Sequence, residues 1–256
     1  MAEFILTERN EGVLTITLNR PKANALSLEM ANELQAALKE AARDHQARCV
    51  LLTGEGEVFS AGQDIYEMLQ AQEESYRFHL QNTYNPLIVQ IRRLEKPVLA
   101  AVNGTVAGAA LGIALACDLR IASQTARFVV GFLGLGLAPD SAVSLFLPAL
   151  IGLGRATEFT FSNEPINADQ ALTWGLVNRV VPPDKLHEQA IAWAATLAKG
   201  PARAMGLAKR AFNKAVYPHL ELVLDYEAHL QEVAKQGKEH QEGVQAFLEK
   251  RPPNYQ

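Results

Sequence analysis

Two small-residue turns are the parts of this 256-residue sequence that best combine residue type and spacing for chemistry. The first, Ser60–Asp64, follows a β-prone pair, and the second, Asn103–Ala110, follows the apolar run Val98–Val102. Each is predicted to join a strand to a helix, and in the second turn Gly108, Ala109 and Ala110 have no side chain large enough to keep a ligand from the backbone. N–H groups in the first turn of a helix lack an intrahelical partner, so two such turns at one sheet edge can direct donors at one developing oxyanion. Tight packing of a buried helix is the alternative explanation for the small residues.

Asp140 is the candidate carboxylate. It lies in Pro139-Asp-Ser141, directly before an apolar run predicted to be helical, and this pattern is also typical of a helix N-cap. Capping and base catalysis therefore both explain the residue from sequence chemistry. A Gly-x-Ser-x-Gly elbow, a phosphate-binding Gly-Lys-Ser/Thr and a zinc-type histidine pair are absent. The six histidines, at positions 45, 79, 187, 219, 229 and 240, fall in polar helical stretches and are predicted to be solvated surface residues.

The composition is that of an ordinary globular protein, with 48% hydrophobic and 20% charged residues. A formal net charge of −4 argues against nucleic acid or an anionic membrane as the main partner. The longest apolar stretch, Val98–Cys117, is interrupted by Asn103 and rich in Gly and Ala, which favours a buried helix over a membrane span. No secretory signal is visible, and Cys49 and Cys117 are predicted to be buried thiols. We therefore expect a cytoplasmic protein.

The hydrophobic pattern alternates strands with helices as far as about residue 181, which indicates an α/β protein with a mostly parallel sheet. Strands are predicted at 4–9, 13–18, 49–53, 98–102, 119–122 and 177–181, and helices at 28–44, 66–96, 145–153, 155–161 and 167–174. A further helix is predicted within the small-residue stretch 105–116, with Gly108, Ala109 and Ala110 in its first turn. Ser27 is the expected N-cap of the helix over 28–44. The last third is predicted to be helical throughout, over 186–199, 201–216, 219–236 and 240–250.

Several motifs together resemble the enoyl-CoA hydratase/isomerase (crotonase) family. They occur in family order and cover nearly the whole chain: Asn19–Leu26, Phe59–Asp64, Lys96–Gly104, Ala116–Asp118, Ala126–Phe128 and Trp174–Asn178. The resemblance implies a spiral of ββα units over residues 1–185 with the acyl-CoA site, and a helical region over 186–256 that mediates assembly into a trimer or a dimer of trimers. It also implies an acyl-CoA thioester substrate and no cofactor beyond that coenzyme A.

The resemblance assigns roles to particular residues. The two oxyanion N–H groups would be those of Gln63 and Ala109. The substrate contacts would come from Lys22, Ala23, Asn24, Ala61, Asp64, Ile65, Gly108, Phe132 and Leu137. Asp140 would be the catalytic base, because Gly136–Ser141 is similar to the isomerase branch linked to phenylacetate degradation.

One departure from the family pattern indicates the reaction. Family hydratases carry two glutamates that hold and activate water, and the corresponding positions here are Gly112 and Phe132. With one base and one oxyanion hole, we expect an isomerase that moves a β,γ double bond of an enoyl-CoA to the α,β position, with the ring-epoxide CoA thioester of phenylacetate degradation as a further substrate. An enoyl-CoA hydratase is the alternative within enzymes, and a non-catalytic acyl-CoA-binding protein is the alternative outside them.

Overall fold

The larger of two β-sheets forms the centre of the molecule. The structure is a computed structural model that describes residues 4–70 and 75–256. Its first two strands form an antiparallel hairpin, and the remaining strands pair in parallel, in the order β1-β2-β3-β5-β7-β10. The bounds are β1 (Ile5–Asn10), β2 (Val13–Leu18), β3 (Cys49–Gly54), β5 (Val98–Val102), β7 (Leu119–Ser123) and β10 (Arg179–Val181). The hairpin and the four later strands were all predicted from the sequence.

A smaller sheet of short strands stands beside the larger one. It contains β4 (Val58–Ser60), β6 (Thr105–Ala107), β8 (Arg127–Val129) and β9 (Ile166–Asn167). Each of β3, β5 and β7 therefore continues, after a turn, into a short strand of this second sheet. The turn before β6 needs Gly104, because a Cβ there would lie 2.7 Å from the Glu57 carbonyl carbon. The repeated strand–strand–helix unit confirms the predicted crotonase-like spiral.

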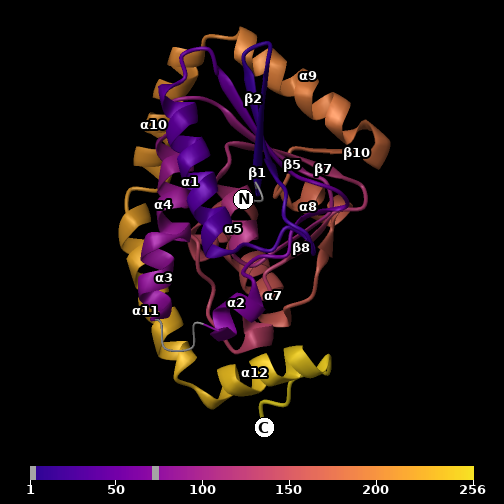
Figure 1. Cartoon of the computed structure of the whole chain (residues 1–256), viewed down its shortest axis with the longest axis vertical. Coiled ribbons are helices and arrows are strands. Elements are labelled where there is room, and N and C mark those ends of the chain that lie inside the picture. The colour runs from indigo at the N-terminus through magenta and orange to yellow at the C-terminus, as the bar shows by residue number, and fades with distance from the viewer. Residues whose placement is uncertain (1–3, 71–74) are drawn as a thin grey trace.

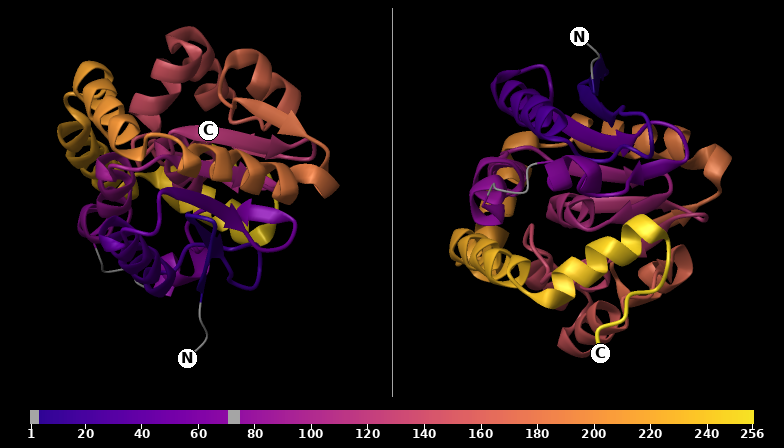
Figure 2. Two further views of the ribbon diagram at one scale, coloured as in Figure 1. Left: turned by 90° about the horizontal axis from the view of Figure 1, so that it is seen from above. Right: turned by 60° about the horizontal axis from the view of Figure 1, so that its bottom comes forward.

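Helices cover both faces of the larger sheet. On one face α1 (Leu28–Arg43), α4 (Tyr84–Arg93) and α5 (Ala109–Ala116) bury the main core, and on the other α9 (Leu186–Lys199) packs across the strands (Figures 1 and 2). Ser27 caps α1 as predicted, since its side chain accepts a hydrogen bond from the Met30 N–H. The other helices are α2 (Ile65–Gln70), α3 (Tyr76–Asn82), α6 (Val143–Ile151), α7 (Leu153–Ser162), α8 (Ala168–Trp174), α10 (Ala202–Val216), α11 (Leu220–Lys235) and α12 (Lys238–Glu249).

The structure differs from the sequence prediction at two places near the turns. The stretch 66–96, predicted as one helical segment, contains α2, α3 and α4, with residues 71–74 outside the described residues. Helix α3 ends at Thr83, whose Oγ1 donates to the His79 carbonyl and whose backbone leaves the helical region. In the small-residue stretch 105–116, helix α5 begins at Ala109, within the first turn predicted for it, but residues 105–107 pair as the unpredicted strand β6 and Gly108 takes a positive φ of 56°.

The four C-terminal helices lie where the sequence predicted them, and they pack on the core. Helix α11 runs beside α3 and α4, and its Leu224 and Ala228 belong to the main core (Figure 1). Helix α12 crosses one end of the molecule and contacts the 3-10 turn Leu133–Leu135 (Figure 2). Residues 186–256 thus contribute to the same packed body as residues 4–70 and 75–185. Within the described part of the chain, every helix is too short or too polar to cross a membrane.

Candidate active site

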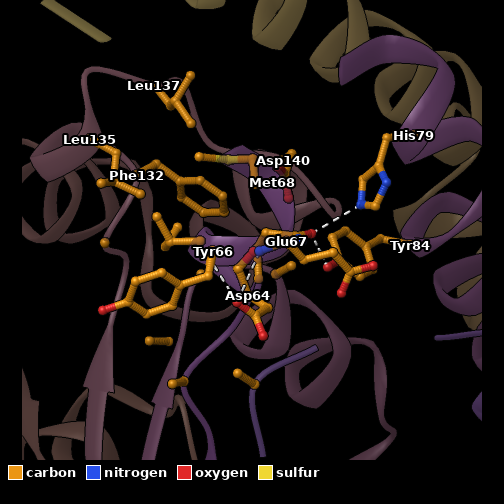
Figure 3. Close-up of a pocket in the computed structure, with 18 of the residues that line it drawn as sticks. Asp64, Tyr66, Glu67, Met68, His79, Tyr84, Phe132, Leu135, Leu137 and Asp140 are labelled. Atoms are coloured by element: carbon orange, nitrogen blue, oxygen red, sulfur yellow. Dashed lines mark hydrogen bonds between the residues drawn. The ribbon is translucent and has the colours of Figure 1, made fainter. Parts of the chain in front are cut away.

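A cavity of about 930 Å³ opens between the two small-residue turns, the loop 131–140 and the helices α3, α4, α11 and α12 (Figure 3). Its wall is largely apolar. Ten of the predicted site residues line it: Lys22, Ala61, Gln63, Asp64, Ile65, Gly108, Ala109, Phe132, Leu137 and Asp140. The sequence motifs, which are up to 118 positions apart in the chain, are therefore brought to one cavity by the fold.

The two turns lie against each other because β4 and β6 pair in parallel. A Cβ on Gly62, which has a φ of 84°, would lie 2.7 Å from the Ala107 carbonyl oxygen, so only glycine permits this approach. In the first turn the Gly62 N–H donates to Ser60 Oγ and the Asp64 N–H to the Leu26 carbonyl. The Gln63 N–H between them has no hydrogen-bond acceptor among residues 4–70 and 75–256.

The second turn leaves an N–H group unused in the same way. The Gly108 N–H donates to the Val129 carbonyl at 3.2 Å, whereas the Ala109 N–H, at the first position of α5, has no acceptor in the described part of the chain. Two backbone donors, on turns in contact with each other, are thus left for a ligand in a cavity. This is the arrangement that an oxyanion hole requires, and each donor of that kind typically contributes about 3 kcal/mol to transition-state stabilisation.

The side chain of Gln63 is fixed by two residues that the sequence prediction did not select. Its Oε1 accepts a short hydrogen bond from the Tyr84 hydroxyl and a second one from His79 Nε2 at 2.9 Å (Figure 3). Because an amide oxygen only accepts, His79 Nε2 carries the proton. Burial raises the pKa of Tyr84 well above its usual value, so its hydroxyl remains a donor. These contacts hold the peptide that presents the Gln63 N–H.

Two histidines differ from the surface placement predicted for all six. His79 lines the cavity, and His240 is buried, with Nδ1 donating to the Leu135 carbonyl at 2.8 Å and Nε2 accepting from the Tyr76 hydroxyl at 2.9 Å. Packing of α12 buries His240, and α3 places a half-buried His79 in the cavity wall, although their neighbours in sequence are polar. The other four histidines are exposed, as predicted.

Asp140 is a buried carboxylate without a cation. It is 6% exposed, and its two oxygens accept hydrogen bonds from Ser141 Oγ at 2.7 Å and from Gln231 Nε2 at 2.8 Å. None of the ion pairs of the described residues includes it. Burial raises the pKa of Asp140 to about 6, although both hydrogen bonds act to lower it. A carboxylate in this state suits a general base near neutral pH.

Asp140 does not cap the helix that follows it, so the capping explanation is wrong. Helix α6 begins at Val143, its N-cap is Ala142, and no side chain of the cap residue bonds to the first turn. The free N–H groups of Ala142 and Ser144 donate instead to the carboxylate of Glu227 on α11, at 2.7 and 3.1 Å. Pro139-Asp-Ser141 resembles a cap in sequence because the partner that caps the helix is 85 residues away.

Two other carboxylates line the cavity, and the fold uses both. Asp64 forms an ion pair with Arg20 at 2.6 Å and caps α2 through the N–H groups of Tyr66 and Glu67. Burial acts to raise the pKa of Asp64, but the hydrogen bonds from Arg20 and the backbone outweigh it and keep the pKa below its ordinary value. Glu67 Oε1 accepts from the Leu28 N–H at 2.9 Å. Asp140 is thus the cavity carboxylate that is both deeply buried and unpaired with a cation.

Two predicted substrate contacts, Ala23 and Asn24, do not line this cavity. They line a neighbouring hollow of about 360 Å³, between the loops 19–24 and 55–58, which Lys22 also borders. The Asn24 side chain is 3% exposed and donates to the carbonyls of Glu55 and Val58, at 3.0 and 2.8 Å. Its amide holds the two loops together, so any substrate contact at Asn24 would be through the backbone.

The two positions at which the family pattern places glutamates carry no carboxylate. Phe132 forms part of the apolar wall, and Gly112 lies inside α5 against Ser141. A Cβ on Gly112 would lie 2.6 Å from Ser141 Cβ, so a glutamate would need the Asp140–Ser141 turn to move. Gln231 holds the Asp140 side chain, and Glu227 holds the turn that follows it. Both come from the region that was predicted only to mediate assembly.

The repeated strand–strand–helix spiral defines the crotonase fold class, and one cavity of this fold is lined by both residues with unused N–H groups and by a buried carboxylate. Residues 8–256 match the family model described as enoyl-CoA hydratase/isomerase, and the chain belongs to that family. It is 39% identical to the 1,2-epoxyphenylacetyl-CoA isomerase of Escherichia coli, over 100% of this chain and 99% of that protein. It is 41% identical to a probable enoyl-CoA hydratase of Rhodobacter capsulatus, over 97% and 96% of the two chains. The crystal structure of an enoyl-CoA hydratase from Mycobacterium avium subsp. paratuberculosis superposes with a TM-score of 0.90, at 33% identity and full coverage of both chains.

Proposed function

We propose that this enzyme isomerises 3-enoyl-CoA thioesters to 2-enoyl-CoA thioesters, with Asp140 as the base. The observation that carries the proposal is the position of one buried carboxylate, without a cation, in the same cavity as two unused backbone N–H groups. Removing a proton next to a thioester creates negative charge on the carbonyl oxygen. A site that offers donors for that oxygen and one proton acceptor has what this reaction needs.

In the proposed reaction Asp140 acts first as a base and then as an acid, while two backbone N–H groups stabilise the intermediate between the two steps. The Asp140 carboxylate removes a proton from C2, and the electron pair moves onto the thioester oxygen to give a dienolate. The N–H groups of Gln63 and Ala109 stabilise that oxygen. The Asp140 carboxylic acid then returns the proton at C4, the C2–C3 double bond forms, and the carbonyl is restored. No water is consumed and the base is regenerated.

The apolar wall of the cavity supports the formation of a dienolate. Phe132 and Leu137 line the cavity that Asp140 reaches, and exclusion of water there keeps the dienolate from other proton donors.

Coenzyme A is part of the substrate, and we propose no additional cofactor. The likeness to the Escherichia coli 1,2-epoxyphenylacetyl-CoA isomerase makes a ring-epoxide CoA thioester the second substrate to test. The free, buried state of both cysteines supports a cytoplasmic location.

Hydration of 2-enoyl-CoA is the second candidate function. Glu67 lines the same cavity as Asp140, and a second carboxylate is what a hydratase needs to hold water. Relatives named as hydratases, such as that of Rhodobacter capsulatus, favour the same candidate. Against it stand the absence of a carboxylate at positions 112 and 132 and the use of Glu67 Oε1 by the Leu28 N–H. A protein that binds acyl-CoA without turnover would have no need of the buried Asp140 charge.

One assay separates these functions. A 3-enoyl-CoA and a 2-enoyl-CoA are each mixed with the wild-type enzyme, and the absorbance of the conjugated thioester is followed. We expect it to appear from the 3-enoyl substrate and to change little with the 2-enoyl substrate. Asp140→Asn should lower isomerisation by roughly 10²–10⁴-fold while acyl-CoA binding persists, since an amide cannot accept the proton.

Asp184→Asn is the matched control, because Asp184 is exposed and distant in sequence from every site element. It should retain wild-type turnover. Wild-type activity in Asp140→Asn would overturn the assignment of the base. Efficient loss of the conjugated 2-enoyl thioester without isomerisation would establish the hydratase instead, and binding without either reaction would establish the non-catalytic protein.

A further inference from the structure

Helix α11 presents two buried polar side chains to the turn that carries Asp140. Glu227 and Gln231 are four residues apart and so lie on one face of the helix, and each is 2% exposed. Polar side chains of this kind are rarely so deeply buried unless they are paired. Both are paired here with residues of the same short segment, Ala138–Ser144.

Gln231 holds the carboxylate itself. Its Nε2 donates to Asp140 Oδ2 at 2.8 Å and to the Ala138 carbonyl at 2.6 Å. The Asp140 side chain is thereby linked to the backbone two residues before Asp140. Gln231 Oε1 is buried and has no hydrogen-bond partner among the described residues. An unsatisfied buried acceptor destabilises a fold, so the amide is retained at a cost to stability. The part of the Gln231 amide that acts on Asp140 is its Nε2 donor.

Glu227 holds the backbone after Asp140. Ser141 and Ala142 have φ values of 56° and 61°, in the left-handed region that non-glycine residues rarely adopt. The Glu227 carboxylate accepts from the N–H groups of Ala142 and Ser144, and from Ser144 Oγ in a short contact. Three donors on one carboxylate keep two strained residues in place, and the strained turn directs Asp140 into the cavity.

We propose that Glu227 and Gln231 are positioning residues, a two-point clamp from α11 that fixes the Asp140 carboxylate in the active-site cavity. The catalytic consequence of this clamp rests on the proposed function, whereas its effect on the Asp140 carboxyl does not. The C-terminal region therefore contributes to the site of its own chain.

The two arms of the clamp act on Asp140 in different ways. Burial raises the pKa of Asp140, and the Gln231 donor, with Ser141, lowers it by stabilising the ionised form. Glu227 acts instead on the backbone that carries Asp140, and burial raises the pKa of Glu227 to about 7, with the charge of Asp140 adding to the increase. The charge of Asp140 also acts on Tyr84 of α4, which burial keeps neutral.

The separate effects of Gln231 on the Asp140 pKa and of Glu227 on the Asp140 turn give a test that a merely structural role would not satisfy. The Asp140 carboxyl is titrated by ¹³C NMR in the wild type, Gln231→Met and Glu227→Gln, with Asp140→Asn used to assign the signal. The pH dependence of kcat/KM for 3-enoyl-CoA is measured in parallel. Gln236→Met, at the exposed end of the same helix, is the matched control.

We expect Gln231→Met to raise the Asp140 pKa, and to lower kcat/KM about tenfold or more at pH 6 but less at pH 8. Glu227→Gln should leave the Asp140 pKa near that of the wild type and reduce kcat with little change in KM, because the turn is held less firmly. Gln236→Met should match the wild type in both measurements.

An Asp140 pKa in Gln231→Met no higher than that of the wild type, or a wild-type kcat in Glu227→Gln, would overturn the clamp. If the wild type does not isomerise enoyl-CoA at all, the proposed function fails, and the NMR titration still decides the clamp. Circular dichroism and thermal unfolding of each variant establish that the signal comes from folded protein. A variant that does not fold is replaced by Gln231→Leu or Glu227→Met, for which the expected signs are the same.

Discussion

Gly112 of α5 and Ser141 of the Asp140 turn are in backbone contact, with no room for a side chain between them. A Cβ on Gly112 would lie 2.6 Å from Ser141 Cβ and 3.1 Å from its carbonyl carbon. Gly112 is also the position at which family hydratases carry a glutamate. The space that a carboxylate at position 112 would occupy is thus filled here by the turn that carries Asp140.

This contact predicts that Gly112→Ala destabilises the protein, although alanine is the better helix former. The added methyl group must displace the Ser141 turn, and overpacking of this kind costs about 1–3 kcal/mol. Isomerase activity should fall as well, because Asp140 moves with its neighbour. Urea unfolding and the enoyl-CoA assay measure the two effects.

Gly154→Ala provides the control for that experiment. Gly154 lies in α7, and a Cβ there would meet no atom within 4 Å. Its substitution should leave stability unchanged or raise it by up to about 1 kcal/mol, without altering activity. If Gly112→Ala behaved like Gly154→Ala, the proposed steric block at Gly112 would be wrong.

The sequence predicted those parts of the site that depend on local pattern. The turns Ser60–Asp64 and Asn103–Ala110 are visible because close backbone approach requires small residues in consecutive positions. Strands such as β3 and β5 are visible because strands buried on both faces are continuously apolar. The strands β6, β8 and β9 were not predicted, since two or three residues do not establish a period.

The sequence did not reveal the residues that act on the site from a distance along the chain. Gln231 and Glu227 lie in a helix whose polar residues look solvated, and only packing of α11 on α3, α4 and α6 buries them. His79 was likewise predicted to be solvated, and Tyr84 was not selected as a site residue. The apolar residues at helical spacing in this stretch, such as Leu220 and Leu230, indicated only a surface that could cover a neighbouring subunit.

Tyr84→Phe should weaken the first oxyanion donor without unfolding the protein. The Tyr84 hydroxyl and His79 both hold Gln63 Oε1, so removal of the hydroxyl leaves one of two anchors. Loss of one neutral hydrogen bond is worth about 0.5–1.5 kcal/mol, and kcat should therefore fall by roughly 2–10-fold with KM little changed. Steady-state kinetics test this, with Tyr66→Phe as the control because the Tyr66 hydroxyl makes no hydrogen bond to a site residue within 4–70 and 75–256. Unchanged kcat in Tyr84→Phe would show that the Gln63 side chain does not position its N–H group.

The protein is expected to assemble as a trimer or a dimer of trimers. Large apolar side chains are exposed on α7 and α10 of the single chain, including Leu153, Phe161 and Phe212 at 71%, 74% and 64%. Burial of such residues against other copies is favourable at about 25 cal/mol per Å². Light scattering at micromolar concentration should give three or six times the 28.0 kDa of one chain. The mass of a single chain would contradict the prediction.

Asp140→Asn is expected to stabilise the folded protein at neutral pH while it abolishes isomerisation. The ordinary pKa of an aspartate is 3.8, and burial raises that of Asp140 to about 6 in the folded state. Between these two values the folded protein binds more protons than the unfolded chain, so the Asp140 contribution to stability falls as the pH rises from about 4 to 6. Above pH 6 the full penalty of the buried charge is present, and it amounts to about 3 kcal/mol on the scale of 1.36 kcal/mol per pH unit.

The asparagine variant lacks this penalty, and the unpartnered Gln231 Oε1 can accept from its amide after a rotation of the Gln231 side chain. Urea unfolding at pH 4 and pH 8 should therefore show a gain in the variant at pH 8 that is largely lost at pH 4. A variant less stable than the wild type at pH 8 would mean that the hydrogen bonds to the Asp140 carboxylate stabilise the turn by more than burial of its charge destabilises it.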